Sequence, residues 1–218
     1  KKTSIDLDTL GVPVGPPHPC SYLKDRVANE RACRIDEVPQ GFYYLMMNHG
    51  WRRSGPLFYK TACQGCDECR PIRVDIPAFK PNRTQRKILR KNSDVRVKAI
   101  PPTPTDEKFD LFVRYQKGRH EGNMCTEREE FENFLYSSPL KTKEFEFYLD
   151  GKLIGSCIVD FDAMTMSAVY SYFDPEMKKR SLGTYSVLYL ITTSNKFNYK
   201  YLYLGYYVDE CRKMNYKT

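Results

Sequence analysis

Residues 144–161 read Glu-Phe-Glu-Phe-Tyr-Leu-Asp-Gly-Lys-Leu-Ile-Gly-Ser-Cys-Ile-Val-Asp-Phe. Apolar residues on both sides of Asp150-Gly151 predict two antiparallel strands joined by a tight hairpin turn. Another strand is predicted at 166–173, where Asp174-Pro175 ends it, and a last one at 200–208. The helical period between these two strands predicts a long helix at 181–196.

Two shorter helices are predicted upstream of the hairpin, at 106–118 and from 126 to about 137. The order is then helix, helix, three strands, helix and strand, which indicates an α+β fold. Before it we expect a short helix at 41–48 and strands at 51–59, 71–76 and 95–100. We place the border between an N-terminal domain, 1–78, and a second domain, 79–218, near Pro81.

A strongly basic segment runs from Arg70 to Lys98, with ten lysines and arginines against two acidic residues. This surplus of eight equals the formal net charge of +8 of the whole chain, so the remainder is balanced. Such a block is typical of a surface that faces phosphates, although a solvated helix face gives the same count. Helical spacing beyond Pro81 predicts an amphipathic helix that carries the cations Arg83, Arg86, Lys87, Arg90 and Lys91.

Three of the eight cysteines form a C-x2-C-x2-C cluster at Cys63, Cys66 and Cys69. Thiolates at this spacing converge on one soft metal, and Cys20 in the Pro-rich lead is the best candidate for a fourth ligand. Four sulfur ligands suit zinc or an iron–sulfur cluster. The alternative is a set of reduced thiols that bind nothing.

No apolar run reaches the roughly 18 residues of a membrane helix, and no signal peptide opens the chain. We therefore expect a cytoplasmic protein with no membrane partner, and a monomer. The start has no Met, so we expect the natural termini to lie elsewhere.

A basic turn with a glycine precedes the predicted long helix, at residues 178–184. A strand, a basic turn and a helix start offer backbone N–H groups and positive charge to a phosphate or carbonyl oxygen. A basic loop with an ordinary serine cap gives the same pattern. The sequence contains no G-x-S-x-G, H-E-x-x-H or Walker motif.

A set of short motifs follows in order along the chain. They are His18-Pro-Cys-Ser-Tyr-Leu23, Gly50-Trp-Arg-Arg-Ser-Gly55, Cys63-Gln-Gly-Cys66-Asp-Glu-Cys69-Arg-Pro-Ile-Arg73, Phe79-Lys-Pro-Asn-Arg-Thr-Gln-Arg86, Tyr172-Phe-Asp-Pro175, Ser181-Leu-Gly-Thr-Tyr185, Tyr203-Leu-Gly-Tyr-Tyr207 and Cys211-Arg-Lys-Met-Asn-Tyr-Lys217. Taken together, these motifs resemble the bacterial-type aminoacyl-tRNA–protein transferases, the aspartate/glutamate leucyltransferase family, which is related to the eukaryotic arginyltransferase. The resemblance runs from about His18 to Lys217. One departure is Leu23, three residues after Cys20, where the arginyltransferase pattern has a second cysteine.

The resemblance implies an enzyme that moves an amino acid, with leucine favoured, from aminoacyl-tRNA to proteins that begin with Asp or Glu. The product carries a destabilising N-terminus for regulated degradation. It also implies a Cys-bearing N-terminal domain followed by a GNAT-type acyltransferase domain with a mixed, largely antiparallel sheet. No cofactor is needed for the chemistry, because the aminoacyl ester is already activated, and no covalent nucleophile is required.

The resemblance also implies which residues form the site. The acyl donor is expected at Arg180, Ser181, Leu182, Gly183 and Thr184. Phosphates of the tRNA are expected at Arg52, Arg53 and the cations of the basic helix. An acidic first residue needs a cation, for which Arg119, His120 and Lys213 are the candidates.

Two rival functions remain open at this point. An arginyltransferase would need a carboxylate in its donor pocket, such as Asp160, Asp162 or Asp174. A metal-stabilised RNA-binding module without catalysis would bind tRNA in a salt-dependent way and transfer nothing.

Overall fold

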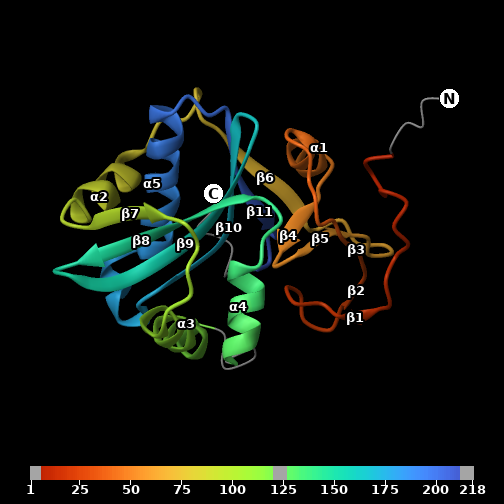
Figure 1. Cartoon of the computed structure of the whole chain (residues 1–218), viewed down its shortest axis with the longest axis horizontal. Helices are drawn as coiled ribbons and strands as arrows, with labels where there is room; N and C mark the ends of the chain where they lie inside the picture. Colours follow the sequence, from red (N-terminus) through yellow and green to blue (C-terminus); the bar gives the residue numbers. More distant parts are fainter. Residues whose placement is uncertain (1–5, 120–126, 212–218) are drawn as a thin grey trace.

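The protein is built around a six-stranded mixed sheet (Figure 1). The computed structural model describes residues 6–119 and 127–211. The strand order is β6-β11-β10-β9-β8-β7, and all neighbours are antiparallel except β10 and β11. The α+β class with a mixed, largely antiparallel sheet is therefore confirmed. The strands are β6 (Arg70–Asp75), β7 (Arg96–Ile100), β8 (Lys141–Leu149), β9 (Lys152–Asp162), β10 (Thr165–Phe173) and β11 (Tyr201–Tyr207).

Helices cover both faces of this sheet (Figure 1). Helices α5 (Leu182–Lys196) and α2 (Arg83–Lys91) pack on one face, around a core that includes Phe145, Phe147 and Val159. Helices α3 (Asp106–Arg119) and α4 (Arg128–Tyr136) pack on the other, against Ile158 and Tyr172. The alternation in residues 144–161 sends successive side chains to these two layers, and this is the pattern that a half-buried strand requires.

A smaller unit from the first third of the chain packs beside the sheet, at the right of Figure 1. Trp51 is fully buried there among Tyr43, Met46 and Phe58, and Tyr203 of β11 joins the same cluster. The unit contains β1 (His18–Pro19), β2 (Val27–Ala28), β3 (Glu30–Arg34), α1 (Phe42–Asn48), β4 (Arg52–Ser54) and β5 (Leu57–Thr61), with β3, β5 and β4 forming a three-stranded sheet.

The expected border between the two domains is residue 78. Strand β6 precedes that position, yet it pairs with β11 in the central sheet, from Arg70 opposite Tyr207 to Asp75 opposite Tyr201. This pairing gives the backbone groups of β11 a partner on its outer side, which an edge strand would lack. Of the described helices, none has the length and apolar character needed to cross a membrane.

Candidate active site

Strands β10 and β11 form a fork. They pair for only three residues, from Thr165 opposite Tyr201 to Ser167 opposite Tyr203, and then continue apart. Both strands are irregular just beyond this point, β10 between Ala168 and Tyr170 in its pairing with β9, and β11 at Gly205, whose φ is 77°. Bulges bend a strand and increase its local twist. The central sheet is thereby opened between two parallel strands.

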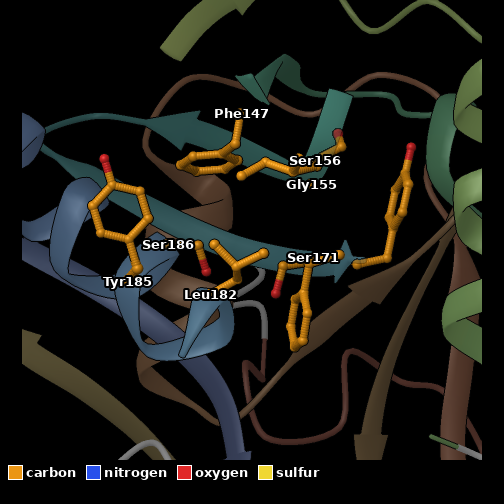
Figure 2. Close-up of a pocket in the computed structure, with 10 residues that line it drawn as sticks. Phe147, Gly155, Ser156, Ser171, Leu182, Tyr185 and Ser186 are labelled. Carbon is orange, nitrogen blue, oxygen red and sulfur yellow. The ribbon is translucent and has the colours of Figure 1, made fainter. Parts of the chain in front are cut away.

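A pocket lies on the β10 side of this fork, between the ends of β8, β9 and β10 and the first turn of α5 (Figure 2). Its walls are mainly apolar. The polar lining residues are three serines and two tyrosines, and no lining residue is charged. The lining residues are Phe147, Ile154, Gly155, Ser156, Ser171, Tyr172, Phe173, Leu182, Tyr185 and Ser186.

The start of α5 presents backbone N–H groups beside this pocket. Ser181 adopts a left-handed conformation (φ 54°, ψ 47°), and its side chain caps nothing. The first intrahelical bond runs from the N–H of Tyr185 to the carbonyl of Ser181 at 2.9 Å. The three N–H groups of residues 182–184 therefore have no intrahelical acceptor. A Cβ at Gly183 would lie 3.1 Å from the Phe173 ring, so any other residue there would push the ring aside by a few tenths of an ångström.

The five residues expected to bind the donor lie together, but only one of them lines the pocket. Leu182 is that residue, and it is buried. The guanidinium of Arg180 is held by Asp94, with both contacts at 2.9 Å. It also donates to the carbonyl of Lys91 at 3.3 Å, so it ties α2 to the start of α5.

Helix α2 is the basic amphipathic helix that the sequence predicts. Asn82 and Gln85 cap its start reciprocally, and Ile88 and Leu89 face the core. The C-terminal end of α2 is tied to the start of α5, because Asn92 donates to the carbonyl of Arg180 at 2.9 Å. All five predicted cations are exposed, namely Arg83, Arg86, Lys87, Arg90 and Lys91.

Arg52 and Arg53 do not face solvent, in contrast to their expected role at tRNA phosphates. Each is only 4% exposed. Arg53 forms a two-point ion pair with Asp160 of β9, at 2.6 and 2.9 Å. Arg52 donates to the backbone carbonyls of Met47 and Trp51. Both side chains are buried because β4 belongs to the part of the small unit that packs on the central sheet, and this burial argues against a role at tRNA phosphates.

The three carboxylates considered for an arginine pocket are all used elsewhere. Asp160 is held by Arg53. Asp162 accepts the backbone N–H groups of Gly41 and Tyr44 at the start of α1, at 2.7 and 2.8 Å. Asp174 caps the 3-10 helix η1 (Pro175–Arg180). None of the three lines the pocket.

A buried polar network backs the pocket from the other face of the sheet. Ser156, a lining residue, donates to Glu144 at 2.6 Å. Glu144 also receives Lys108 at 2.8 Å and the Tyr136 hydroxyl at 3.1 Å. Lys108 reaches Glu146 as well, again at 2.8 Å. The alternation of β8 and β9 predicts that these side chains share a face, but nothing in the sequence marks that face as adjoining a pocket.

The four cysteines of the predicted metal site line one cavity in the small unit. Backbone N–H groups donate to two of the sulfurs, Leu23 to Cys20 and Asn29 to Cys63, both at 3.4 Å. Burial and the neighbouring thiols raise the pKa of Cys69 to about 11. Within the described residues, no three Cys, His, Asp or Glu side chains are close enough to hold a metal ion.

Two of the expected acceptor residues, His120 and Lys213, lie outside the described residues, as does the side chain of Arg119, which ends α3. Ser156 and Tyr185 line the pocket but were not among the site residues expected from the sequence. Both are ordinary strand and helix positions in the sequence, so only the tertiary structure identifies them.

The fold has a counterpart among solved structures, and the sequence matches a family of transferases. The fold resembles the crystal structure of FemX, with a TM-score of 0.51 over 84% of this chain and 65% of that chain, at 10% sequence identity. Residues 18–87 match the family described as "Arginine-tRNA-protein transferase, N terminus", and residues 107–218 match its C-terminal counterpart. The protein is an aminoacyltransferase that takes its amino acid from tRNA and passes it to acceptor proteins.

Two relatives of known name narrow this class to one family. The "Aspartate/glutamate leucyltransferase" of Saccharophagus degradans is 43% identical over 98% of this chain and 92% of its own length. That of Marinobacter nauticus is 39% identical over 98% and 91%. The chain belongs to the aspartate/glutamate leucyltransferase family, as its sequence motifs indicated.

Proposed function

We propose that this enzyme transfers leucine from leucyl-tRNA to the α-amino group of proteins whose first residue is Asp or Glu. The names of the relatives, aspartate/glutamate leucyltransferases, support both the donor and the acceptor. The observation that carries the choice of donor is the uncharged lining of the pocket at β10. Leucine needs only apolar walls, such as Phe147, Leu182 and Tyr185, whereas a buried guanidinium needs a carboxylate.

The start of α5 is proposed to hold the reacting ester, as in a GNAT-type acyltransferase. Attack of the amine on the ester places negative charge on the carbonyl oxygen. The N–H groups of Leu182, Gly183 and Thr184 point out of a helix N-terminus, where the helix dipole favours such charge. Arg180 acts indirectly in this scheme, because its guanidinium fastens α2 to the donor side.

Ser156 and Glu144 are the proposed route for the proton. The attacking α-amine has a pKa near 7.7–8.0 and must lose a proton in the reaction. Ser156 lines the pocket, and its hydroxyl donates to Glu144 on the other face of the sheet. In the proposed route the proton crosses the sheet at Ser156 and passes through this hydroxyl to that carboxylate. Lys108 then balances the charge of the pair.

The exposed cations of α2 are proposed to bind the phosphates of the tRNA. The helix ends beside η1, where the exposed Lys178 and Lys179 extend the basic surface toward the pocket. A tRNA held on this surface would bring its aminoacyl end to the start of α5. Affinity that depends on such contacts falls steeply with salt, because counterions are released.

The cysteine cavity is the proposed position of zinc or an iron–sulfur cluster. The donor set fits, since four thiols from two segments surround one cavity, and N–H groups donate to two of the sulfurs. Binding would require Cys20, Cys63, Cys66 and Cys69 to approach one another more closely. Elemental analysis and absorbance near 400 nm after anaerobic purification test this proposal. Neither metal nor cluster in fresh protein would contradict it.

An arginine donor is disfavoured on a specific observation. Asp160, Asp162 and Asp174 are each bound to other groups, and no carboxylate lines the pocket. We further propose that the enzyme works as a monomer in the cytoplasm, where aminoacyl-tRNA is made.

The deciding experiment offers the protein separately charged leucyl- and arginyl-tRNA together with an Asp-initiated reporter. We expect label to move from leucyl-tRNA alone. Transfer of arginine would contradict the proposal that the uncharged pocket binds leucine. Binding of tRNA without transfer of either label would contradict the assignment of function to this chain.

A further inference from the structure

Arg52 is a buried cation whose hydrogen bonds are only half satisfied. Its Nη1 donates to the carbonyls of Met47 at 3.1 Å and Trp51 at 2.6 Å. Its Nε and Nη2 are buried and have no hydrogen-bond partner. Across the described residues it forms no ion pair, although it is only 4% exposed. An unpaired charge in such a position is costly, so a counter-charge supplied by a ligand would be strongly favoured.

The neighbouring arginine shows what those two nitrogens are suited to bind. Arg53 uses Nε and Nη2 to hold both carboxylate oxygens of Asp160, at 2.6 and 2.9 Å. Its Nη1 donates to a backbone carbonyl, that of Gly55, at 2.7 Å. Arg52 is anchored in the same way, through Nη1 and backbone carbonyls, and leaves the same edge without an acceptor. That edge matches a carboxylate in a two-point geometry.

The surroundings of Arg52 favour an anion from outside the chain. Its guanidinium lies 5.5 Å from the ring centres of both Tyr203 and Tyr206. Those rings carry no charge, and within the described residues no carboxylate pairs with the Nε and Nη2 of Arg52. A buried positive charge thus lies where the described residues offer it no counter-charge.

The position of this cluster relates it to the reaction. Tyr203 is the last residue of β11 that pairs with β10, opposite Ser167, and Tyr206 follows after the strands have parted. Ser171, Tyr172 and Phe173, further along β10, line the donor pocket. Arg52 therefore lies against the β11 branch of the fork, and the donor pocket lies along the β10 branch.

We propose that Arg52 binds the side-chain carboxylate of the acceptor's first residue through Nε and Nη2, and so determines the specificity for Asp and Glu. The α-amine of that residue then points along the fork toward the ester. This inference rests on the proposed function. Tyr59 lies opposite Arg52 on β5, lines the cysteine cavity and packs against Tyr206, so the acceptor enters by moving these rings.

The test compares peptides that differ only in their first residue, Asp, Glu, Asn or Gln, with the full chain and charged tRNA. Arg52→Met keeps the volume and removes the charge, and Arg52→Lys keeps the charge without the two-point geometry. Arg73→Met is the matched control. Arg73 also stacks on a tyrosine of β11, with 3.9 Å to the Tyr201 ring, but it is exposed and donates to Asn48 and Tyr203.

We expect Arg52→Met to lower kcat/KM for the Asp and Glu peptides by about 100-fold or more, chiefly through KM, and to leave the Asn and Gln peptides unchanged. Arg52→Lys should recover part of the loss, and Arg73→Met should keep the preference for acidic residues. A folded Arg52→Met enzyme with the wild-type ratio of Asp to Asn peptides would overturn the proposal.

A second measurement needs no substituted enzyme to be active. In wild-type protein labelled with 15N-arginine, the Nε–H resonance of Arg52, assigned by its loss in Arg52→Lys, should shift with the Asp peptide and not with the Asn peptide. No shift at saturating Asp peptide would overturn the role of Arg52. If wild-type protein transfers nothing to any peptide, the proposed function fails, and this spectrum still decides whether Arg52 is a carboxylate site.

Discussion

At the scale of single residues, the buried polar side chains explain more of this molecule than the exposed ones. Arg53 and Arg52 stand side by side in β4, and one has a carboxylate partner while the other has none. The same sequence feature, Trp51-Arg52-Arg53, suggests a phosphate-binding pair when burial is unknown. The direction in which each side chain points decides its chemistry, and adjacent residues of a strand point to opposite sides.

Ser156 provides a first residue-scale prediction. Ser156→Ala removes the proposed proton route and should lower the single-turnover rate of transfer by about 100-fold. Glu144 keeps Lys108 and Tyr136 as partners, so the loss of unfolding free energy should be only about 1 kcal/mol. Ser171→Ala, in the same pocket, is the control and should retain most of the rate. Equal rates for the two variants would rule out the route through Ser156.

Asp174 provides a prediction on pH. Burial opposes its ionisation, but the N–H of Glu176 and the cations Arg114 and Lys152 outweigh burial and lower its pKa below the usual 3.8. A lowered folded pKa stabilises the protein above pH 3.8, and this contribution is lost as the pH falls through the folded value. Asp174→Asn should therefore cost about 1–3 kcal/mol at pH 7. Urea unfolding at several pH values should show the difference from wild type shrinking toward pH 3; a difference independent of pH would contradict it.

At the scale of elements, α2 and α5 work as a pair. The capping box of α2, its apolar stripe and its cations could all be predicted from the sequence, because each depends on residues three or four positions apart. The attachment of α2 to the start of α5 could not. It depends on Asn92, Asp94 and Arg180, whose contacts join residues more than 80 positions apart.

A charge-neutralising pair tests the role of α2. Arg86→Gln with Lys87→Gln should weaken the binding of tRNA and flatten its dependence on salt by a log–log slope of about 2. Both residues are exposed, so the melting temperature should stay close to that of wild type. Lys196→Gln with Lys200→Gln removes the same charge at the other end of α5 and is the control. Equal losses of tRNA affinity in both double variants would indicate a general effect of charge and would contradict a tRNA site on α2.

At the scale of the whole molecule, the buried contacts between the small unit and the sheet hold the chain together. Arg53 with Asp160, and Asp162 with the start of α1, each join residues more than 100 positions apart. The pocket is thus built on a sheet that carries the small unit on one side. Two of the three carboxylates considered for an arginine pocket, Asp160 and Asp162, serve this packing, and Asp174 caps η1.

The Arg53–Asp160 pair supports a prediction at this scale. Arg53→Met leaves Asp160 buried without its cation and should cost about 3–5 kcal/mol of unfolding free energy. The double variant Arg53→Met with Asp160→Leu removes both charges and should recover most of that loss, as measured by urea unfolding. Equal destabilisation in the single and double variants would show that the pair contributes through packing alone.

The sequence by itself determined the class of the fold, the order of the strands and α-helices from residue 70 onward, the basic helix and the family. Each of these depends on local periodicity, on turn residues or on motifs read in order. Only the tertiary structure decided which strands part into a fork, which residues line the donor pocket and which arginines are buried. The reason is physical: burial and pairing depend on contacts such as Arg53 with Asp160, between side chains far apart along the chain, and no local pattern records such contacts.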